Sequence, residues 1–387
     1  MRNGRGLKIL VVLTLVASAV ALVLMTSACS SSGAAGTSAT PGSTSSTASA
    51  STDTSVASSH STAPRTPGAG ADLFPVMMSA KGLYGYVDKT GKTVIEPMFA
   101  SAAPFKDGIA LVAGAGAFGT MYGYIGTDGK WIVEPNFYAG AVFSDGWGMV
   151  QTFDGTITYV DVDDNKLVEA STAYSLPFSE GLAPIQKDGL FGYIDTKGTT
   201  VITPQFADAQ SFSEGLAPAA AKVNGAVKYG FIDKTGTWVV KAQYDRVGPF
   251  SGGLALVSAG GKYGFIDKTG KVVIPLAYDF AEGFGDGLAP VSTGGNWGYI
   301  DTTGKMVIPA TFYWAHSFSG GIGIIEQKPA DVEKYGYIDK AGKVIAEPVY
   351  DSVTPFTNGL GLVDKAAGGV HTWSYLDATG KVVWSSK

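Results

Sequence analysis

A single pattern of about 35 residues returns along most of this chain, and a fixed period constrains a fold more than any other sequence feature. The clearest copy runs from Gly252 to Ile274. Each unit contains a marker glycine between aromatic residues: Gly85, Gly123, Gly192, Gly230, Gly264, Gly298 and Gly336. Two degenerate units carry Thr158 and Ser374 at the marker position. The chain therefore holds nine units, with markers 34 to 38 residues apart.

Each unit predicts three short strands, rich in β-branched and aromatic residues. In the clearest copy they cover residues 253–257, 263–267 and 272–274, and we name them strands A, B and C. A unit of this size cannot bury its own apolar face, so neighbouring units must stack. We therefore expect an all-β fold of nine tandem three-stranded antiparallel units, forming a propeller-like ring or spiral or an open β-solenoid. Nine units exceed the usual propeller range of about four to eight blades, so the solenoid stays open as an alternative.

The junction between strands B and C has the sequence of a tight turn. In Asp267–Gly270 the aspartate opens a type I turn, and the glycine occupies a position that needs a positive φ. The pattern recurs at Asp88–Gly91, Asp195–Gly198, Asp233–Gly236, Asp301–Gly304 and Asp339–Gly342. Because a carboxylate at this offset caps its own turn, we interpret these aspartates as structural rather than catalytic or calcium-binding.

Small residues recur on strands A and B, for example Ala255 and Gly264. Their lack of bulk predicts a shallow groove across the unit, filled by an aromatic residue of the next connection such as Tyr278 or Phe284. Burial of each such ring would contribute about 1.5–3 kcal/mol. The aromatic residues are thereby explained as core, without a ligand.

The repeated motif resembles the WG repeat family, also called KWG repeats. The matching elements are the Tyr/Trp-Gly-Tyr/Phe-Ile-Asp-x-x-Gly-Lys stretch and the Phe-Ser-x-Gly-Leu-Ala stretch, as in residues 212–217. The resemblance covers essentially all of residues 72–387. It implies a bacterial, β-rich repeat module without an assigned general chemistry, and so an architecture rather than a reaction.

The beginning of the chain has the order of a secretory signal: basic residues, an apolar run over 9–25, and small residues before Cys29. The Thr26-Ser-Ala-Cys29 end resembles a bacterial lipobox, with Thr26 in place of the usual leucine. This resemblance implies a signal peptide over 1–28 and a lipid attached to Cys29, which would hold the protein at the extracytoplasmic face of the cell membrane. An uncleaved membrane anchor is the alternative, since seventeen apolar residues are marginal for a span.

Residues 29–71 predict a flexible tether, because Ser, Thr, Ala, Gly and Pro make up nearly all of it and bury too little apolar surface to fold. Residues 72–387 form the repeat domain. Loss of residues 1–28, which hold three basic and no acidic residues, lowers the formal net charge from −5 to −8. Nucleic acid is therefore not an expected partner. One cysteine and three histidines give no reason to expect a disulfide, metal or cofactor.

Variation between units falls in the loop between strands A and B. Ten residues separate the first apolar residue of strand A from the marker in Leu182–Gly192, Leu254–Gly264 and Leu288–Gly298. Fourteen separate them in Ile109–Gly123, Leu216–Gly230, Ile322–Gly336 and Leu360–Ser374. Insertions confined to one loop project from one edge of a repeat array, and such an edge is often the binding face. Unconstrained drift of the loop is the alternative.

The connection Phe312–Phe318 departs from the others, because it carries Tyr313, Trp314 and His316. Trp297 belongs to the same unit. Aromatic rings with a polar tip suit sugar rings or the side chains of a partner, so these four residues form our candidate ligand-binding cluster. Ordinary packing between units is the alternative, and no metal site is expected at His316.

We thus expect a non-catalytic, envelope-anchored protein that binds an extracellular or envelope partner, either a protein or a glycan. One rival is a secreted carbohydrate-active enzyme that uses two carboxylates. Its candidates are Glu180, Glu214, Glu282, Glu326 and Asp331. The other rival is a structural spacer without a ligand.

Overall fold

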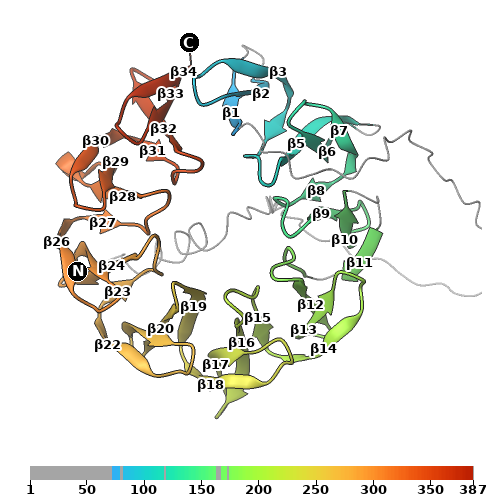
Figure 1. Cartoon of the computed structure of the whole chain (residues 1–387), viewed down its shortest axis with the longest axis vertical. Helices are drawn as coiled ribbons and strands as arrows, with labels where there is room; N and C mark the ends of the chain where they lie inside the picture. Colours follow the sequence, from blue (N-terminus) through green and yellow to red (C-terminus); the bar gives the residue numbers. More distant parts are fainter. Residues whose placement is uncertain (1–71, 79–81, 117–118, 163–166, 172–173, 387) are drawn as a thin grey trace, which may run out of the picture. The chain divides into compact units, whose positions relative to one another are not determined.

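The computed structural model describes residues 72–78, 82–116, 119–162, 167–171 and 174–386. The expected signal peptide, Cys29 and the tether up to residue 71 lie outside these described residues. Within the described part, strands form nine separate antiparallel sheets, and these follow one another around a ring (Figure 1). The fold is a nine-bladed β-propeller, so the ring alternative is confirmed over the open solenoid.

Each blade is one sheet, and consecutive blades follow the chain. Blades 1 to 3 contain β1 (Phe74–Met77), β2 (Tyr84–Val87), β3 (Thr93–Phe99); β4 (Ser101–Ala102), β5 (Ile109–Gly116), β6 (Gly119–Gly126), β7 (Trp131–Phe137); β8 (Ala139–Gly140), β9 (Trp147–Gln151), β10 (Ile157–Asp161) and β11 (Leu167–Ser171). Blades 4 to 6 contain β12 (Leu182–Lys187), β13 (Leu190–Asp195), β14 (Thr200–Phe206); β15 (Asp208–Ala209), β16 (Ala217–Val223), β17 (Ala226–Ile232), β18 (Trp238–Tyr244); β19 (Arg246–Ser251), β20 (Leu254–Ala259), β21 (Lys262–Asp267) and β22 (Val272–Tyr278). Blades 7 to 9 contain β23 (Phe280–Ala281), β24 (Leu288–Thr293), β25 (Asn296–Asp301), β26 (Met306–Phe312); β27 (Trp314–Ala315), β28 (Ile322–Gln327), the short 3₁₀ helix η1 (Pro329–Asp331), β29 (Lys334–Asp339), β30 (Val344–Tyr350); β31 (Ser352–Val353), β32 (Leu360–Ala367), β33 (Val370–Asp377) and β34 (Val382–Ser385).

The expectation of three strands per unit is incomplete, because most blades have a fourth strand. The connection after strand C runs back beside strand A of the next blade and pairs with it, as β23 does through Phe280 opposite Ser292. In blade 4 this pairing is reduced to one bridge between Ser175 and Ile185. The extra strand lies on the inner side of the ring, and strand C lies at the rim (Figure 1).

The marker glycine is required by strand C, and the predicted aromatic-filled groove is wrong. On strand C, Tyr278 pairs with Tyr263 and Ile274 pairs with Phe265, so the backbone between them bulges toward Gly264. A Cβ atom at Gly264 would lie 2.5 Å from the carbonyl oxygen of Ile274. The space beside the marker is therefore filled by backbone, which leaves no room for a ring.

The turn between strands B and C is confirmed. The carboxylate of Asp267 accepts hydrogen bonds from the Thr269 hydroxyl at 2.6 Å, the Thr269 amide at 2.9 Å and the Lys271 amide at 3.1 Å. These donors, the hydroxyl first, hold the pKa of Asp267 below its usual value. Gly270 takes the expected positive φ of 86°.

Neighbouring blades are joined by an aromatic pair. The strand B residue after the marker packs against a phenylalanine from the connection that enters the next blade; the ring centroids of Phe265 and Phe284 are 4.7 Å apart. Equivalent pairs are Tyr86–Phe105, Tyr124–Phe143, Tyr159–Phe178, Tyr193–Phe212, Phe231–Phe250, Tyr299–Phe318 and Tyr337–Phe356. Phe284 therefore belongs to the core and covers the unit that contains Gly264, as expected, but it packs on Phe265 rather than on the marker glycine.

All six tyrosines of these pairs also form a hydrogen bond across the same interface. The Tyr299 hydroxyl donates to the carbonyl oxygen of His316 at 2.8 Å, seventeen residues further on. The same donation joins Tyr86 to Ala103, Tyr124 to Ala141, Tyr159 to Leu176, Tyr193 to Gln210 and Tyr337 to Thr354. Burial raises the pKa of Tyr299 far above its usual value, so its hydroxyl remains a donor.

The ring closes between blades 9 and 1 by the same kind of contact. Tyr375 packs against Phe74 with ring centroids 5.4 Å apart, and its hydroxyl donates to the carbonyl oxygen of Pro75 at 2.9 Å. Leu360 and Val76 are buried in the same cluster. Blade 1 consists of β1 to β3 and blade 9 of β31 to β34, so each sheet is built from one continuous stretch of chain. Side-chain packing closes the ring without exchange of a strand.

Within the part of the chain that the structure describes, there is no helix of the length and apolar character that crossing a bilayer requires.

The close approach at the marker predicts a large difference between two glycine positions. Gly264→Ala should destabilise the protein by at least about 1–3 kcal/mol, because the new methyl group overlaps the backbone of strand C. Gly283→Ala is the matched control, since a Cβ atom there would meet nothing within 4 Å. Urea unfolding of both variants measures the effect. Equal free energies of unfolding would contradict the account of the marker.

Candidate functional site

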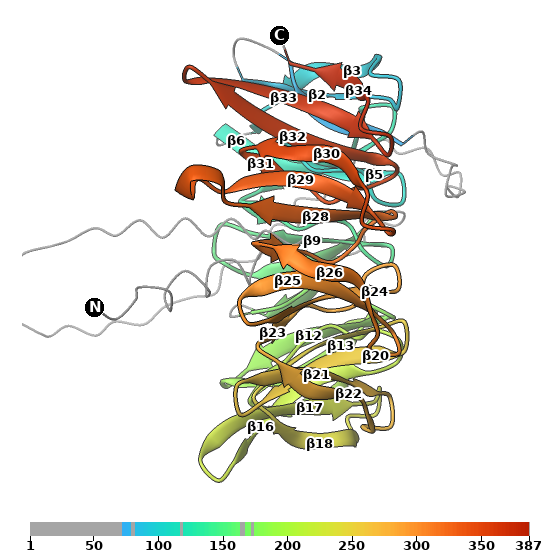
Figure 2. The ribbon, with the colours of Figure 1, turned by 90° about the vertical axis from the view of Figure 1, so that its left-hand side faces the viewer.

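The loops between strands A and B all lie on one side of the propeller, which we call the A–B face. The longer units extend their hairpins on this side, as in β16–β17 and β32–β33, and blade 8 carries η1 there. Figure 2 shows these elements projecting from the same side of the propeller. The expectation that the insertions share one edge is therefore confirmed.

In blades 6, 7 and 9 an aspartate on the A–B face links two blades. Asp279 of blade 7 accepts a hydrogen bond from Lys262 of blade 6 at 2.6 Å, and another from the amide of Gly294 at 2.9 Å. Both donors lower the pKa of Asp279. Asp245 and Asp351 bind Lys228 and Lys334 in the same way. We call this arrangement the Lys–Asp link.

Blades 3 and 8 carry a tyrosine at the position of this aspartate. The amides of Asp279, Tyr138 and Tyr313 donate to strand A carbonyl oxygens at the same register, those of Ser292, Gln151 and Glu326. Met121 and Asn296 stand seventeen residues before the two tyrosines, where the Lys–Asp link has its lysine. Both members of the link are therefore replaced together, and the tyrosine rings are left 63% and 40% exposed.

A second side chain contacts each of these tyrosines, fifteen residues further on. Phe153 lies beside Tyr138 with ring centroids 6.1 Å apart, and Phe153 is itself 58% exposed. In blade 8 the Lys328 ammonium lies 5.3 Å from the centroid of the Tyr313 ring, within the range of a cation–π interaction. Among the described residues, the exposed phenylalanine, tyrosine and tryptophan side chains are those of Tyr138, Phe153, Tyr174 and Tyr313. Each lies in an A–B hairpin or beside the end of strand A that leads into it, and therefore on the A–B face.

The structure divides the four residues of the predicted ligand-binding cluster. Trp297 is 3% exposed and Trp314 is half-buried, and their ring centroids lie 4.5 Å apart across the boundary between blades 7 and 8. Phe280 stacks on the other side of Trp297 at 6.4 Å. Trp297 therefore packs inside the interface, and Tyr313 is the member that solvent reaches best.

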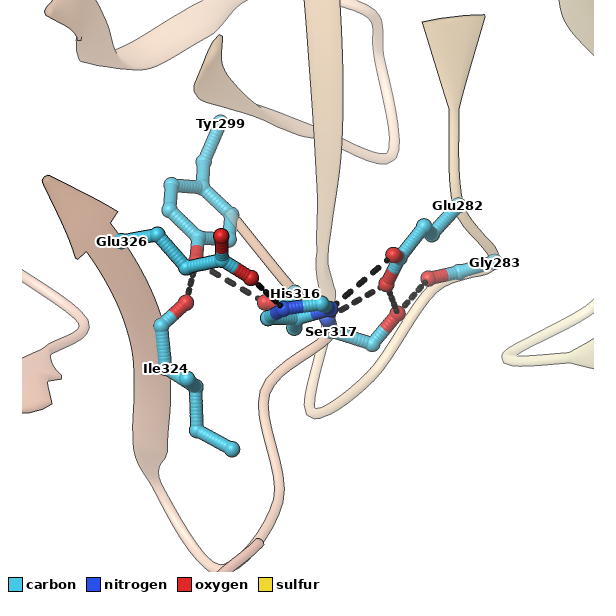
Figure 3. Close-up of polar contacts among 7 residues, drawn as sticks. All are labelled: Glu282, Gly283, Tyr299, His316, Ser317, Ile324 and Glu326. Carbon is cyan, nitrogen blue, oxygen red and sulfur yellow. Dashed lines mark hydrogen bonds and ion pairs between the residues drawn. The ribbon is translucent and has the colours of Figure 1, made fainter. Parts of the chain in front are cut away.

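His316 is buried between two carboxylates that the chain brings from two blades (Figure 3). Its Nδ1 lies 3.2 Å from Oε1 of Glu282, and its Nε2 lies 2.8 Å from Oε1 of Glu326. Burial alone would lower the pKa of His316, but the hydrogen bonds and charges of the two glutamates raise it to about 9. The imidazolium thus connects blades 7 and 8 as part of a charged network.

The same network fixes the backbone around His316. Glu282 also accepts a hydrogen bond from the amide of Ser317 at 3.0 Å, and the Ser317 hydroxyl donates to the carbonyl oxygen of Gly283 at 2.7 Å. With the Tyr299 hydroxyl on the His316 carbonyl, the connection into blade 8 is held at both its side chain and its backbone. Among the described residues, no group of three or more His, Cys, Asp and Glu side chains is placed to hold a metal ion.

The other candidate carboxylates also join blades. Glu214 accepts hydrogen bonds from the amides of Gly252 and Gly253 at 2.7 and 3.0 Å, in the equivalent turn of the next blade. Glu180 accepts one from the amide of Gly215 at 3.1 Å. The side chain of Asp331 lies outside the described part of the structure. Each described candidate therefore has a structural partner.

The sequence analysis missed Tyr138 and Phe153. Alignment of the connections contains the signal: Tyr138 follows Phe137 as Tyr313 follows Phe312, whereas Asp279 and Asp351 follow a tyrosine at the same place. Phe153 could not be found this way, because its place beside Tyr138 depends on how the A–B hairpin folds back.

The buried imidazolium predicts a pH-dependent stability. A histidine whose pKa rises from about 6.5 to about 9 on folding stabilises the protein fully below pH 6.5, and this contribution is lost as the pH rises through 9. The shift corresponds to about 3 kcal/mol. We expect wild type to lose this much more stability than His316→Gln between pH 6 and pH 9.5 in urea unfolding. Parallel pH profiles for the two proteins would exclude the charged network.

Comparison with solved structures returns proteins of low sequence identity. The computationally designed Ika8 protein matches with a TM-score of 0.42 and 15% identity, over 63% of this chain and 85% of that one. BamB from Moraxella catarrhalis has a TM-score of 0.38 and 13% identity, over 70% and 92% of the two chains. Apo AztD from Citrobacter koseri has a TM-score of 0.40 and 13% identity, over 72% and 92%. No curated protein matches the chain.

The family model for the WG containing repeat matches eight segments of the chain. They are residues 84–113, 122–155, 174–191, 191–225, 229–263, 263–297, 297–328 and 335–366. These segments fall in blades 1 to 9, and all of them except 174–191 include a marker glycine and a complete aromatic pair. The chain therefore belongs to the family of proteins built from WG repeats.

Proposed function

We propose that this WG-repeat propeller is a non-catalytic binding protein of the cell envelope, which captures an extracytoplasmic partner on its A–B face. The observation that carries the proposal is that the exposed aromatic side chains of the described residues gather on this one face. Tyrosine is among the side chains that most often anchor an interface.

The rigidity of the ring supports a binding role. Each blade is held to the next by an aromatic pair, and six of the tyrosines in these pairs add a hydrogen bond to the next blade. Side chains on the A–B face are therefore presented in fixed positions, which lowers the entropy lost on binding. Of the described carboxylates considered for catalysis, Glu180, Glu214 and Glu282 are engaged in contacts between blades, and Glu326 binds His316 within blade 8. These engagements support the non-catalytic part of the proposal.

The location rests on the sequence at the start of the chain. Lipid attached to Cys29 would anchor the protein, and residues 29–71 would act as a tether with a reach of roughly 35 Å. A tether of this length holds the propeller near the membrane while leaving its faces accessible to envelope components.

Anchoring is tested by a single substitution. Cys29→Ala should abolish incorporation of radiolabelled palmitate and release the protein from lipid-mediated attachment, because the thiol is the attachment atom. Labelling and fractionation of cells producing wild type and variant measure both effects. The lipoprotein proposal fails if the variant still loses its first 28 residues and remains bound to the membrane.

Binding on the A–B face is tested with the chain from residue 29 onward, carrying Cys29→Ser to remove the lipid. Tyr313→Ala should weaken its co-sedimentation with isolated envelopes at least tenfold, as expected for an exposed aromatic anchor. Val239→Ala on strand β18 is the matched control, since Val239 is 42% exposed and Tyr313 40%. Equal binding by the two variants would exclude Tyr313 from the interface.

Trp314→Ala separates packing from binding in the same assay. Because Trp314 packs on Trp297, its loss should lower the thermal midpoint, whereas Tyr313→Ala should leave the midpoint close to that of wild type. A Tyr313→Ala variant that unfolds would show that this tyrosine serves the fold.

A further inference from the structure

We propose that the A–B face carries two equivalent aromatic stations, and that both bind a single uncharged polysaccharide chain. The blade 3 station consists of Tyr138 and Phe153, and the blade 8 station of Tyr313 and Lys328. This inference rests on the proposed binding function and names the class of its partner.

The two stations occupy the same place in the fold. The Tyr138 amide donates to the Gln151 carbonyl at 2.9 Å, and the Tyr313 amide donates to the Glu326 carbonyl at 3.1 Å. In both blades the side chain fifteen residues further on contacts the tyrosine ring. The backbone therefore presents both rings at the same height on the A–B face.

The fold itself has another use for this position. In blades 6, 7 and 9 it holds the aspartate of the Lys–Asp link, which connects two blades. Blades 2 and 5 have Ala100 and Ala207 at this position, whereas blades 3 and 8 place a large exposed ring there. A tyrosine at a position where other blades have an ion pair or an alanine adds apolar surface that a bound partner would cover.

Sugar chemistry fits these stations better than a protein surface does. A standard protein interface buries about 800 Å² per partner around a continuous apolar core. Here charged Lys–Asp links occupy the same position in three of the other blades, so the exposed rings form separate spots. A sugar residue needs one ring face and a few hydroxyl contacts, and a polymer passes over polar surface between such contacts.

Charge favours an uncharged polymer. The mature chain carries a formal net charge of −8. The aspartates of the Lys–Asp links are paired with lysines, so these lysines are not free for anionic groups. Lys328 brings a positive charge to the blade 8 station, but it lies over the Tyr313 ring and the blade 3 station has no equivalent cation. The overall field of the protein therefore repels an acidic polysaccharide.

The positions of the stations require a long ligand. Figure 1 places β8 and β27, which follow Tyr138 and Tyr313, on opposite sides of the ring. A short oligosaccharide reaches one station, whereas a long chain reaches both and gains from the second, intramolecular contact. Binding strength should thus depend on polymer length and on the presence of both tyrosines.

The experiment measures binding of the chain from residue 29 onward with Cys29→Ser to cellulose and chitin, with alginate as the acidic comparison. We expect binding to at least one uncharged polymer and none to alginate. Tyr138→Ala and Tyr313→Ala should each weaken polymer binding at least tenfold, and the double variant should abolish it. Val239→Ala is the control for exposure.

Two further measurements fix the mechanism. Titration with a trisaccharide of the bound polymer should give two sites in wild type and one in each single variant. Tyr138→Trp, which keeps an aromatic ring, should retain the polymer binding that Tyr138→Ala loses. The circular dichroism spectrum of every variant should match that of wild type. Tyr138→Phe is the second variant to use if Tyr138→Ala unfolds, and it should retain most of the binding, because the ring face carries the contact.

The results that overturn the inference are distinct from those that overturn the envelope-binding proposal. Absence of binding to both uncharged polymers, or an unchanged affinity of Tyr138→Ala, excludes the two stations. If Tyr313→Ala still reduces co-sedimentation with envelopes and protease treatment of the envelopes abolishes it, the partner is a protein. The proposed function then stands and the polysaccharide inference fails.

Discussion

Every blade of this propeller contains one aromatic side chain that the blade cannot bury by itself. The strand B residue after the marker, such as Phe265, is covered only when the connection into the next blade places Phe284 on it at 4.7 Å. An isolated unit would expose that ring and lose its stabilisation, so folding requires neighbours. The long chain, the fixed period and the closed ring all follow from this need for a neighbour.

The hydrogen bond that accompanies the aromatic pair is secondary to it. Blades 5 and 6 have Phe231 and Phe265 where most blades have a tyrosine, and their ring pairs are still 4.7 Å apart. The tyrosine hydroxyl satisfies a carbonyl group that would otherwise be buried without a donor, as Tyr299 does for His316. Packing of the two rings therefore holds neighbouring blades together with or without the hydroxyl.

Much of the fold could be predicted from local sequence patterns, whereas the contacts between blades could not. The turn at Asp267 depends on residues two and four positions away, so the sequence reveals it. Where a blade has an inner strand, that strand is usually two residues long, as at Phe280–Ala281, and carries no periodic pattern. The burial of His316 depends on Glu282, 34 residues away in another blade. The sequence around His316 does not reveal its two carboxylate partners, so its burial could not be predicted.

The closure between blades 9 and 1 has a consequence for how such proteins change over evolutionary time. Tyr375 meets Pro75 and Phe74 through the same ring contact and hydroxyl donation that join other neighbours, and no strand is shared between the two blades. Duplication or deletion of one whole unit in the gene therefore leaves a ring pair at every junction, even where the polar contacts between blades differ. Only the angle between successive blades has to adjust, so the closure lets the number of blades drift while the ring remains sealed.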